Sequence, residues 1–276
     1  MTPSEMGEEE FAKVLAFIYR VAGIRIPATK RVMISNRLRP RLKATGIETF
    51  PAYYTFLTSL AGKAETPFFL DAITTNETYF FRDPQHYEWI GDTFLPEIAH
   101  QAMLKKRPKS LRIWSAACST GEEPYSVAIK ILGKRAMFTG WTIRLLGTDL
   151  SGAALKRARE ARYDVRALRL VSAEDRQTFF EHDAALQKWT VKPEVRALPS
   201  WKLHNLLQPI PEETFDCVIL KNVLIYFDPV SKQTALNHLL KSISPGGYLV
   251  VGPTEGIYTM LGSLIRHKTW LYQRPE

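Results

Sequence analysis

Residues 111–123 read Leu-Arg-Ile-Trp-Ser-Ala-Ala-Cys-Ser-Thr-Gly-Glu-Glu, and they carry the strongest indication of the fold class. Residues 111–117 have the apolar and small side chains of a buried strand, and residues 121–134 have the spacing of a helix. A loop of small residues lies between them, and the helix begins with two acids, Glu122 and Glu123. This order is typical of an open α/β sheet, in which ligands bind at the carboxyl ends of the strands.

The same alternation of strand and helix continues along the chain. The further strands are predicted at residues 142–149, 215–220 and 248–251, and the further helices at residues 153–162 and 230–243. Pro245-Gly246-Gly247 is predicted to form a turn before the last of these strands. The pattern predicts an open, mostly parallel, Rossmann-like α/β sheet.

Two segments depart from this alternation. In residues 1–70 apolar side chains recur at helical spacing, which predicts a small N-terminal helical domain. Residues 179–203 contain two short strand-like runs and predict an inserted antiparallel hairpin. We therefore expect the helical domain to be followed by one α/β domain at residues 71–276, which contains the insertion.

Composition limits the function. The chain has 276 residues, a net charge of +9 and two distant cysteines, Cys118 and Cys217. The positive charge suggests an acidic partner, without choosing among nucleic acid, a membrane surface and an acidic protein. The isolated cysteines and scattered histidines predict neither a disulfide framework nor a metal site. Because the sequence has no signal-peptide pattern and no apolar run of membrane-spanning length, we expect a cytoplasmic protein without membrane insertion.

Asp149 stands at the tip of the second predicted strand. A carboxylate at this point can accept hydrogen bonds from two adjacent hydroxyls, which the ribose of a nucleoside cofactor presents. The three-glycine dinucleotide fingerprint and the Gly-Lys-Ser/Thr phosphate motif are both missing, which lowers the odds of NAD or a nucleoside triphosphate. An alternative stays open, in which Ser119 or Thr120 caps the following helix and Asp149 caps the next one.

Three motifs carry a family resemblance. They read Asn-Glu-Thr-Tyr-Phe-Phe-Arg-Asp at residues 76–83, Trp-Ser-Ala-Ala-Cys-Ser-Thr-Gly-Glu-Glu-Pro-Tyr-Ser at residues 114–126 and Asn-Val-Leu-Ile-Tyr-Phe-Asp at residues 222–228. In this order and spacing they resemble the CheR-type chemotaxis receptor methyltransferases, which are protein-glutamate O-methyltransferases. The resemblance covers nearly the whole chain. It implies methyl transfer from S-adenosylmethionine to glutamates of the helical cytoplasmic domain of chemoreceptors, which yields glutamate methyl esters and S-adenosylhomocysteine.

The resemblance also implies site residues, position by position. Arg82 matches a residue of the first motif that closes over the cofactor, and Tyr226 lies where the family has a tyrosine close to the transferred methyl group. We expect both to be catalytic by orienting the cofactor or the incoming carboxylate. The residues expected to bind the cofactor are Asn76, Thr78, Arg82, Glu123, Asp149, Asn205, Leu206, Lys221 and Asn222. Lys221 stands where many relatives carry arginine. The tetrapeptide Gly-Pro-Thr-Glu at residues 252–255 replaces a more usual Gly-His-Ser-Glu.

Substrate docking is expected at the helical domain. Residues 30–43 form a predicted helix that Pro40 ends or kinks, and they carry six cations. We expect Arg31, Arg37 and Arg41 to dock the glutamate-rich receptor helices. Some relatives also bind a C-terminal receptor peptide at a glycine-rich hairpin loop. Residues 180–189 contain no glycine, so we expect no peptide tether here.

Two other functions fit parts of the sequence. A nucleic-acid methyltransferase would explain the charge of +9, but the Pro-Pro motif of amino-methylating enzymes does not follow Asn222. A non-catalytic module that binds the cofactor or a receptor would keep the same motifs. A methyl-transfer assay separates the three alternatives.

Overall fold

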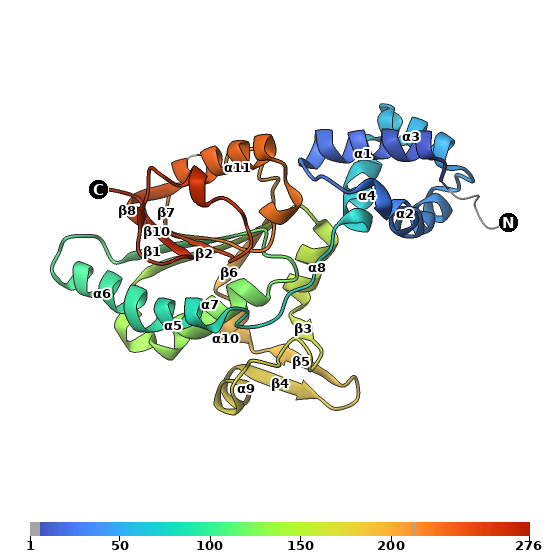
Figure 1. Ribbon diagram of the computed structural model, residues 1–276. Helices are drawn as coiled ribbons and strands as arrows, with labels where there is room; N and C mark the ends of the chain where they lie inside the picture. The colour runs from blue at the N-terminus through green and yellow to red at the C-terminus, as the bar shows by residue number, and fades with distance from the viewer. Residues whose placement is uncertain (1–5, 212–213) are drawn as a thin grey trace.

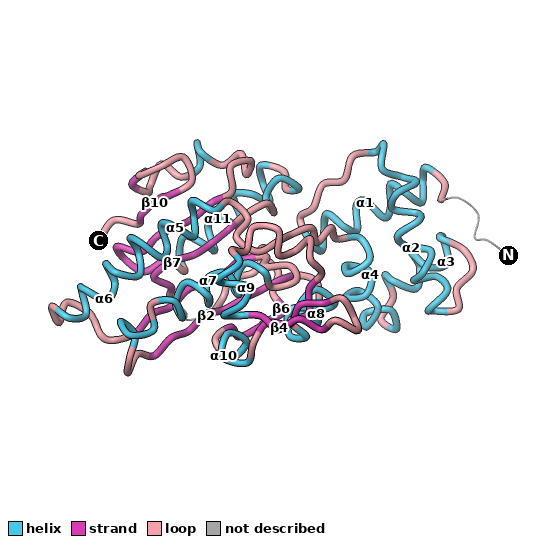
Figure 2. The backbone as a smooth tube through the Cα atoms, turned by 90° about the horizontal axis from the view of Figure 1, so that it is seen from below, coloured by secondary structure: helices cyan, strands magenta, loops and turns pink. Residues whose placement is uncertain are grey.

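The computed structural model describes residues 6–211 and 214–276, so the first five residues of the predicted helical domain lie outside the described residues. The described chain forms a helical bundle, a large α/β sheet and a small antiparallel sheet (Figure 1). In Figure 2 the bundle lies beside the α/β part of the molecule, with α1 and α4 close to the junction. The bundle and the sheet have separate apolar cores. Within the described residues no helix is both long and apolar enough to span a membrane.

The bundle contains the four helices α1 (Glu8–Ala22), α2 (Arg31–Thr45), α3 (Phe50–Thr58) and α4 (Thr66–Ile73). The first two each end at a glycine in the left-handed conformation, Gly23 and Gly46, both at φ 70°. Pro40 was expected to end or kink the helix, and it does not end it, because α2 continues to Thr45. The exposed ring of Pro40 points away from the core, while Leu38 and Leu42 on either side are fully buried and hold the helix in place.

The large sheet has seven strands in the order β6-β2-β1-β7-β8-β10-β9. Their bounds are β1 (Ser110–Ala116), β2 (Thr142–Asp149), β6 (Pro199–Leu203), β7 (Phe215–Leu220), β8 (Ile243–Val251), β9 (Ile265–Arg266) and β10 (Leu271–Gln273). The first five strands in this order pair in parallel, and β10 pairs antiparallel with both of its neighbours. The predicted open, mostly parallel sheet is therefore confirmed.

The predicted turn at Pro245-Gly246-Gly247 lies inside β8 instead of before it. Phe215 of β7 pairs with Ile243, but Cys217 pairs with Tyr248, so the residues between them on β8 bulge out of the register. A bulge needs the same permissive residues as a turn, and Gly246 has a φ of 71°. Pro245-Gly246-Gly247 therefore interrupts the regular strand as predicted, but it forms a bulge within β8 and not a turn before it.

Helices cover both faces of the large sheet. In Figure 1 α11 (Pro229–Lys241) lies on one face, and α5 (Pro84–Trp89), α6 (Leu95–Met103) and α7 (Glu122–Gly133) lie on the other. α8 (Gly152–Glu160) follows β2 and lies next to α4 of the bundle. This arrangement brings the bundle to the carboxyl ends of the central parallel strands.

The small antiparallel sheet has the order β3-β5-β4, with strands β3 (Arg162–Tyr163), β4 (Phe180–Asp183) and β5 (Lys188–Val191). The short helices α9 (Ala173–Phe179) and α10 (Pro193–Arg196) flank the β4–β5 hairpin. An inserted antiparallel hairpin was expected at residues 179–203. The structure adds β3 to it, and it assigns residues 199–203 to β6, the edge strand of the large sheet.

Candidate active site

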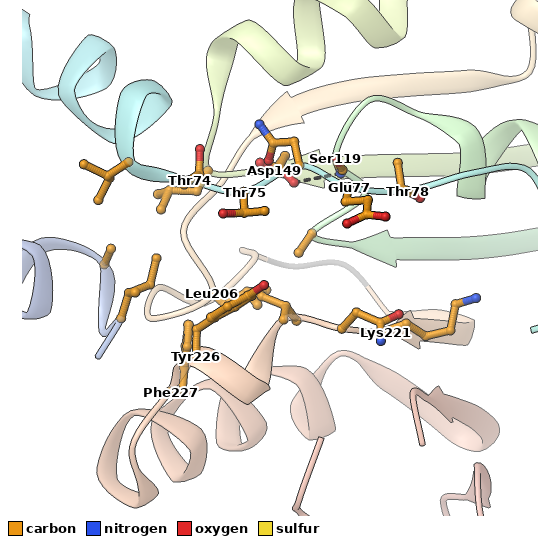
Figure 3. A pocket seen from close by; sticks show the side chains of 18 of the residues that line it. Thr74, Thr75, Glu77, Thr78, Ser119, Asp149, Leu206, Lys221, Tyr226 and Phe227 are labelled. Atoms are coloured by element: carbon orange, nitrogen blue, oxygen red, sulfur yellow. Dashed lines mark hydrogen bonds between the residues drawn. The ribbon is translucent and has the colours of Figure 1, made fainter. Parts of the chain in front are cut away.

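One pocket, of about 290 Å³, lies where the bundle meets the carboxyl ends of β1, β2 and β7. Every residue predicted to be catalytic or to bind the cofactor lines it: Asn76, Thr78, Arg82, Glu123, Asp149, Asn205, Leu206, Lys221, Asn222 and Tyr226. Figure 3 shows two facing walls. Asp149, Ser119 and Thr78 lie on one wall, and Tyr226 and Lys221 lie on the other. The fold therefore gathers into one cavity residues that are up to 150 positions apart in the sequence.

The loop after β1 is tightly folded. Ala117 and Ser119 both adopt the left-handed region, with φ of 61° and 51°. Gly121 has a φ of 95°, and a Cβ at this position would lie 2.7 Å from the Cβ of Ala158 on α8. Only glycine fits there, so α7 can pack closely against α8. The small side chains leave the main chain of the loop open to a ligand.

Asp149 is the buried acid of the first wall and is 7% exposed. Its two oxygens accept the backbone N–H groups of Ser119 and Ser151, each at 2.8 Å. Burial raises the pKa of the Asp149 carboxyl, whereas these two amides lower it. A carboxylate has about four acceptor positions, so capacity for two ligand hydroxyls is left, and the residue fits the predicted ribose contact.

The side chains that were considered as helix caps, Ser119, Thr120 and Asp149, do not cap α7 or α8. The N-cap of α7 is Gly121, which has no side chain, and Thr120 Oγ1 donates to the Glu122 carboxylate at 2.7 Å instead. Ser151, and not Asp149, caps α8 by accepting the N–H of Ala154 at 3.0 Å. The capping alternative from the sequence is therefore wrong at both helices.

Glu122 and Glu123 have different environments although they are adjacent. Glu123 lines the pocket, accepts Ser115 Oγ at 2.7 Å and lies 3.2 Å from the Lys221 ammonium group. Glu122 is 4% exposed and has no cation beside it among the contacts described. Burial raises the pKa of Glu122 to about 7, although the Thr120 hydroxyl lowers it.

Lys221 is a buried cation whose ammonium group is already occupied by protein atoms. It donates to the Arg82 carbonyl oxygen at 2.7 Å and lies 3.6 Å from Asp83 and 3.2 Å from Glu123. Its ring neighbour is Tyr87, whose centroid lies 4.9 Å away. Lys221 therefore ties the segment that carries Arg82 to the beginning of α7. Its direct contact with the cofactor stays a prediction.

The two residues predicted to be catalytic come from separate segments. Arg82 donates to the Glu77 carbonyl oxygen at 3.1 Å, and its guanidinium carbon lies 5.7 Å from the ring centroid of Tyr79. Tyr226 is 40% exposed, so its ring can meet a molecule that enters the pocket. Its carbonyl oxygen accepts the N–H of Arg25 at 2.7 Å, which joins this wall to the bundle.

Asn205 also links the bundle to the pocket. Its side-chain amide donates to the Val21 carbonyl oxygen of α1 at 2.7 Å, and its Oδ1 accepts the N–H of Leu207 at 3.0 Å. The Asn205 side chain thus holds the pocket wall against the bundle. Asn205 and the neighbouring Leu206 both line the pocket. The expected cofactor contact of Asn205 is untested by this geometry.

Sequence reasoning missed Glu255, which is completely buried behind the second wall. Its carboxylate accepts the N–H of Asn222 and, at 2.8 Å, the N–H of Leu224. Asn222 has a φ of 59°, which is a strained backbone conformation, and the two hydrogen bonds to Glu255 hold the turn in it. The Gly-Pro-Thr-Glu tetrapeptide at residues 252–255 could have pointed to it, because its Gly and Glu match the usual family pattern although its two middle residues do not.

The three predicted docking residues differ in their surroundings. Arg41 donates to both oxygens of the buried Glu65, at 2.7 Å each, and Glu65 also accepts the Tyr53 hydroxyl at 2.8 Å. Arg31 lies 3.7 Å from Glu8; the Arg31 side chain is partly exposed, and that of Glu8 is almost fully exposed. Arg41 therefore stabilises the bundle internally, whereas Arg31 is accessible to a partner.

Arg37 is the predicted docking residue that lines the pocket. Its guanidinium group donates to the Ile73 carbonyl oxygen at 2.6 Å and to Thr75 Oγ1 at 2.9 Å. These contacts fix the end of α4 and the beginning of the segment that leads to Arg82. Docking by Arg37 stays a prediction, and the structure gives this residue a supporting role as well.

The open parallel sheet, the tight loop after β1 and the acid at the tip of β2 together define the class of S-adenosylmethionine-dependent methyltransferases. Two family descriptions match the chain: "CheR methyltransferase, all-alpha domain" over residues 9–74 and "CheR methyltransferase, SAM binding domain" over residues 76–268. The chain belongs to the CheR methyltransferase family.

Curated relatives resemble the chain along most of its length. A chemotaxis protein methyltransferase from Vibrio parahaemolyticus is 34% identical over 261 residues, which cover 93% of this chain and 92% of the relative. One from Salmonella typhimurium is 31% identical over 265 residues, which cover 93% of this chain and 86% of the relative. Both the bundle and the sheet therefore have counterparts in these enzymes.

Proposed function

We propose that this protein transfers methyl groups from S-adenosylmethionine to glutamate carboxylates of chemoreceptor helices, in the cytoplasm. The observation that carries the proposal is the position of the pocket between the sheet and the bundle. The bundle contributes Arg25, Lys30 and Arg37 to the lining, so an acidic acceptor is favoured at that side. Family membership supports methyl transfer in chemotaxis.

The proposed reaction needs little acid–base chemistry. S-Adenosylmethionine supplies an activated methyl group when it is bound, and a glutamate carboxylate is already an ionised nucleophile at neutral pH. The chain has to align the acceptor and exclude water. Correct alignment of two reactants contributes roughly 7–11 kcal/mol to catalysis. Methyl transfer gives a glutamate methyl ester and S-adenosylhomocysteine.

We assign separate tasks to the predicted site residues. Asp149, on the first wall, holds the ribose hydroxyls of the cofactor. Arg82 and Tyr226 orient the incoming carboxylate, and Lys221 positions Arg82 through its carbonyl oxygen. The other predicted cofactor residues that line the pocket keep that assignment: Asn76, Thr78, Glu123, Asn205, Leu206 and Asn222.

We propose that the bundle docks the receptor and that the β4–β5 hairpin binds no receptor tail. The turn of the hairpin contains no glycine, and Gln187 takes the positive φ of 50° instead. Asp183 Oδ1 accepts the N–H groups of Ala185 and Leu186, at 3.0 Å each, so these amides are unavailable to an added peptide. Titration of a C-terminal receptor peptide should give no saturable binding, and micromolar binding at the hairpin would contradict this proposal.

The function is tested with tritiated S-adenosylmethionine on purified receptor cytoplasmic fragments and, in parallel, on RNA. We expect label on the receptor fragment, none on RNA and none with the Asp149→Ala variant. Label on RNA would favour a nucleic-acid methyltransferase. Cofactor binding without label on either acceptor would favour a non-catalytic module.

A further inference from the structure

Asp71, near the end of α4, connects the bundle to the α/β domain. Its carboxylate accepts the Ser151 hydroxyl at 2.7 Å and lies 3.2 and 3.3 Å from the backbone nitrogen of Ala153. Both of these residues belong to the beginning of α8, next to which α4 lies (Figure 1). An acid from one domain therefore accepts hydrogen bonds from the capping hydroxyl and from one N-terminal amide of a helix in the other domain.

Ser151 connects this contact to the first wall of the pocket. Its side chain is fully buried, donates to Asp71 and accepts the N–H of Ala154 at 3.0 Å, so its rotamer is fixed at both ends. Its own backbone N–H donates to Asp149 Oδ1 at 2.8 Å. The second oxygen of Asp149 accepts the N–H of Ser119 in the loop after β1, a bond drawn in Figure 3. A continuous chain of hydrogen bonds thus runs from α4 to that loop.

Charge attraction does not explain this connection. Asp71 and Asp149 have the same charge, and their repulsion opposes the ionised form of Asp149. The contact is held by hydrogen bonds to Ser151 and Ala153, which need an acceptor at residue 71 and not a negative charge. An asparagine could supply one such acceptor through its carbonyl oxygen.

We propose that Asp71 is a positioning residue for S-adenosylmethionine, and that it acts through Ser151 on the Asp149 carboxylate. This inference rests on the proposed function, in which Asp149 holds the cofactor. The bundle is then part of the cofactor site and not only a docking surface. Asp71 itself does not contact the cofactor in this proposal. A shift of α4 would nevertheless alter cofactor binding, because it would move Ser151 and with it the Asp149 carboxylate.

The test uses calorimetric titration of the full chain with S-adenosylhomocysteine, together with thermal unfolding. Asp71→Ala should weaken binding about 10-fold, whereas Asp71→Asn should lose less than about 3-fold because one acceptor remains. Glu65→Gln is the matched control. Glu65 is another carboxylate of the bundle that accepts hydrogen bonds, but its partners are Arg41 and Tyr53. This control should lower the unfolding temperature and leave the affinity unchanged.

A double-mutant cycle separates positioning from general destabilisation. Ser151→Ala should weaken binding as much as Asp71→Ala, and the double variant should be no weaker than either single variant. Full additivity, or wild-type affinity in Asp71→Ala, would overturn the inference. If Asp71→Ala does not fold, wild-type affinity in Ser151→Ala overturns it as well. Wild-type affinity in folded Asp149→Ala would instead reject the cofactor-binding role that the proposed function gives to Asp149.

Discussion

The two walls of the pocket are each built around a carboxylate that accepts two backbone amides, but the two carboxylates differ in position. Asp149 of the first wall lines the pocket, while Glu255 of the second wall is fully buried behind it. The amides of Asp149 come from the loop after β1 and from the start of α8, and those of Glu255 come from one strained turn. The same chemistry therefore leaves a carboxylate facing the pocket on one wall and a carboxylate that only supports the backbone on the other.

The largest expected effect tests the ligand-binding role of the first wall. Asp149→Ala should weaken cofactor binding about 100-fold, or ~3 kcal/mol, because hydrogen bonds to a charged acceptor are lost. Calorimetric titration with S-adenosylhomocysteine measures this change, and circular dichroism checks the fold. Unchanged affinity in a folded variant would mean that Asp149 only supports the loop after β1.

Glu122 lies behind the first wall, as Glu255 lies behind the second, and it provides a pH test. Burial raises the pKa of Glu122 from 4.5 to about 7 in the folded chain. Between these pH values the unfolded chain releases a proton that the folded chain keeps, so stability falls as the pH rises toward 7. Glutamine keeps the acceptor for Thr120 without this charge.

Glu122→Gln should therefore be more stable than the wild type above pH 7, by up to about 3 kcal/mol, and equal to it below pH 4.5. Urea unfolding at pH 4.5, 6 and 8 measures the difference. An unfolding free energy with the same pH dependence in both proteins would show that Glu122 does not titrate in this way.

Because Glu255 supports the backbone, its replacement should affect stability more than cofactor binding. Glu255→Ala leaves the N–H groups of Asn222 and Leu224 without an acceptor and should lower the free energy of unfolding by about 2 kcal/mol. Thermal unfolding measures this loss. Affinity for S-adenosylhomocysteine should fall less than in Asp149→Ala, and an equal fall would remove the distinction between the two walls.

Orientation of the acceptor predicts a smaller effect on turnover. Tyr226→Phe removes one hydroxyl and should lower turnover up to about 10-fold, with little change in stability because the ring is already 40% exposed. Arg82→Ala should act in the same direction. Steady-state methylation of a receptor fragment measures both variants, and wild-type turnover in both would mean that the active centre lies elsewhere.

The smallest expected effect concerns docking on the bundle. Reversal of Lys30 and Arg31 to glutamate should slow receptor methylation a few-fold, and added salt should slow the wild-type protein. Arg37 and Arg41 are poorer choices, because their guanidinium groups hold Ile73 and Glu65 in place. Reversal of the exposed Lys63 is a matched control in the same bundle. Methylation that is insensitive to both salt and reversal would count against electrostatic docking.

Periodicity was sufficient for the fold class, and the resemblance of three motifs to a known family was sufficient for the set of residues that gather at the pocket. Local patterns alone pointed only to Asp149 and the loop after β1. They were insufficient where a residue's partner is distant in the sequence. The pairing of Arg41 with Glu65 and the contact of Asp71 with Ser151 depend on packing between helices, which no local pattern encodes. A local signal can also have two outcomes, and for this reason Pro245-Gly246-Gly247 predicted a turn although the chain forms a bulge.

Methyl transfer to a carboxylate oxygen, which we propose for this pocket, gives an ester, and the ester can be detected directly. A receptor fragment labelled with tritiated S-adenosylmethionine is treated with mild alkali, and the volatile methanol is measured. Esters hydrolyse under these conditions, so we predict that nearly all of the label is released as methanol. Label that stays on the protein after alkali would show methyl transfer to an atom other than a carboxylate oxygen, and it would overturn the proposed reaction.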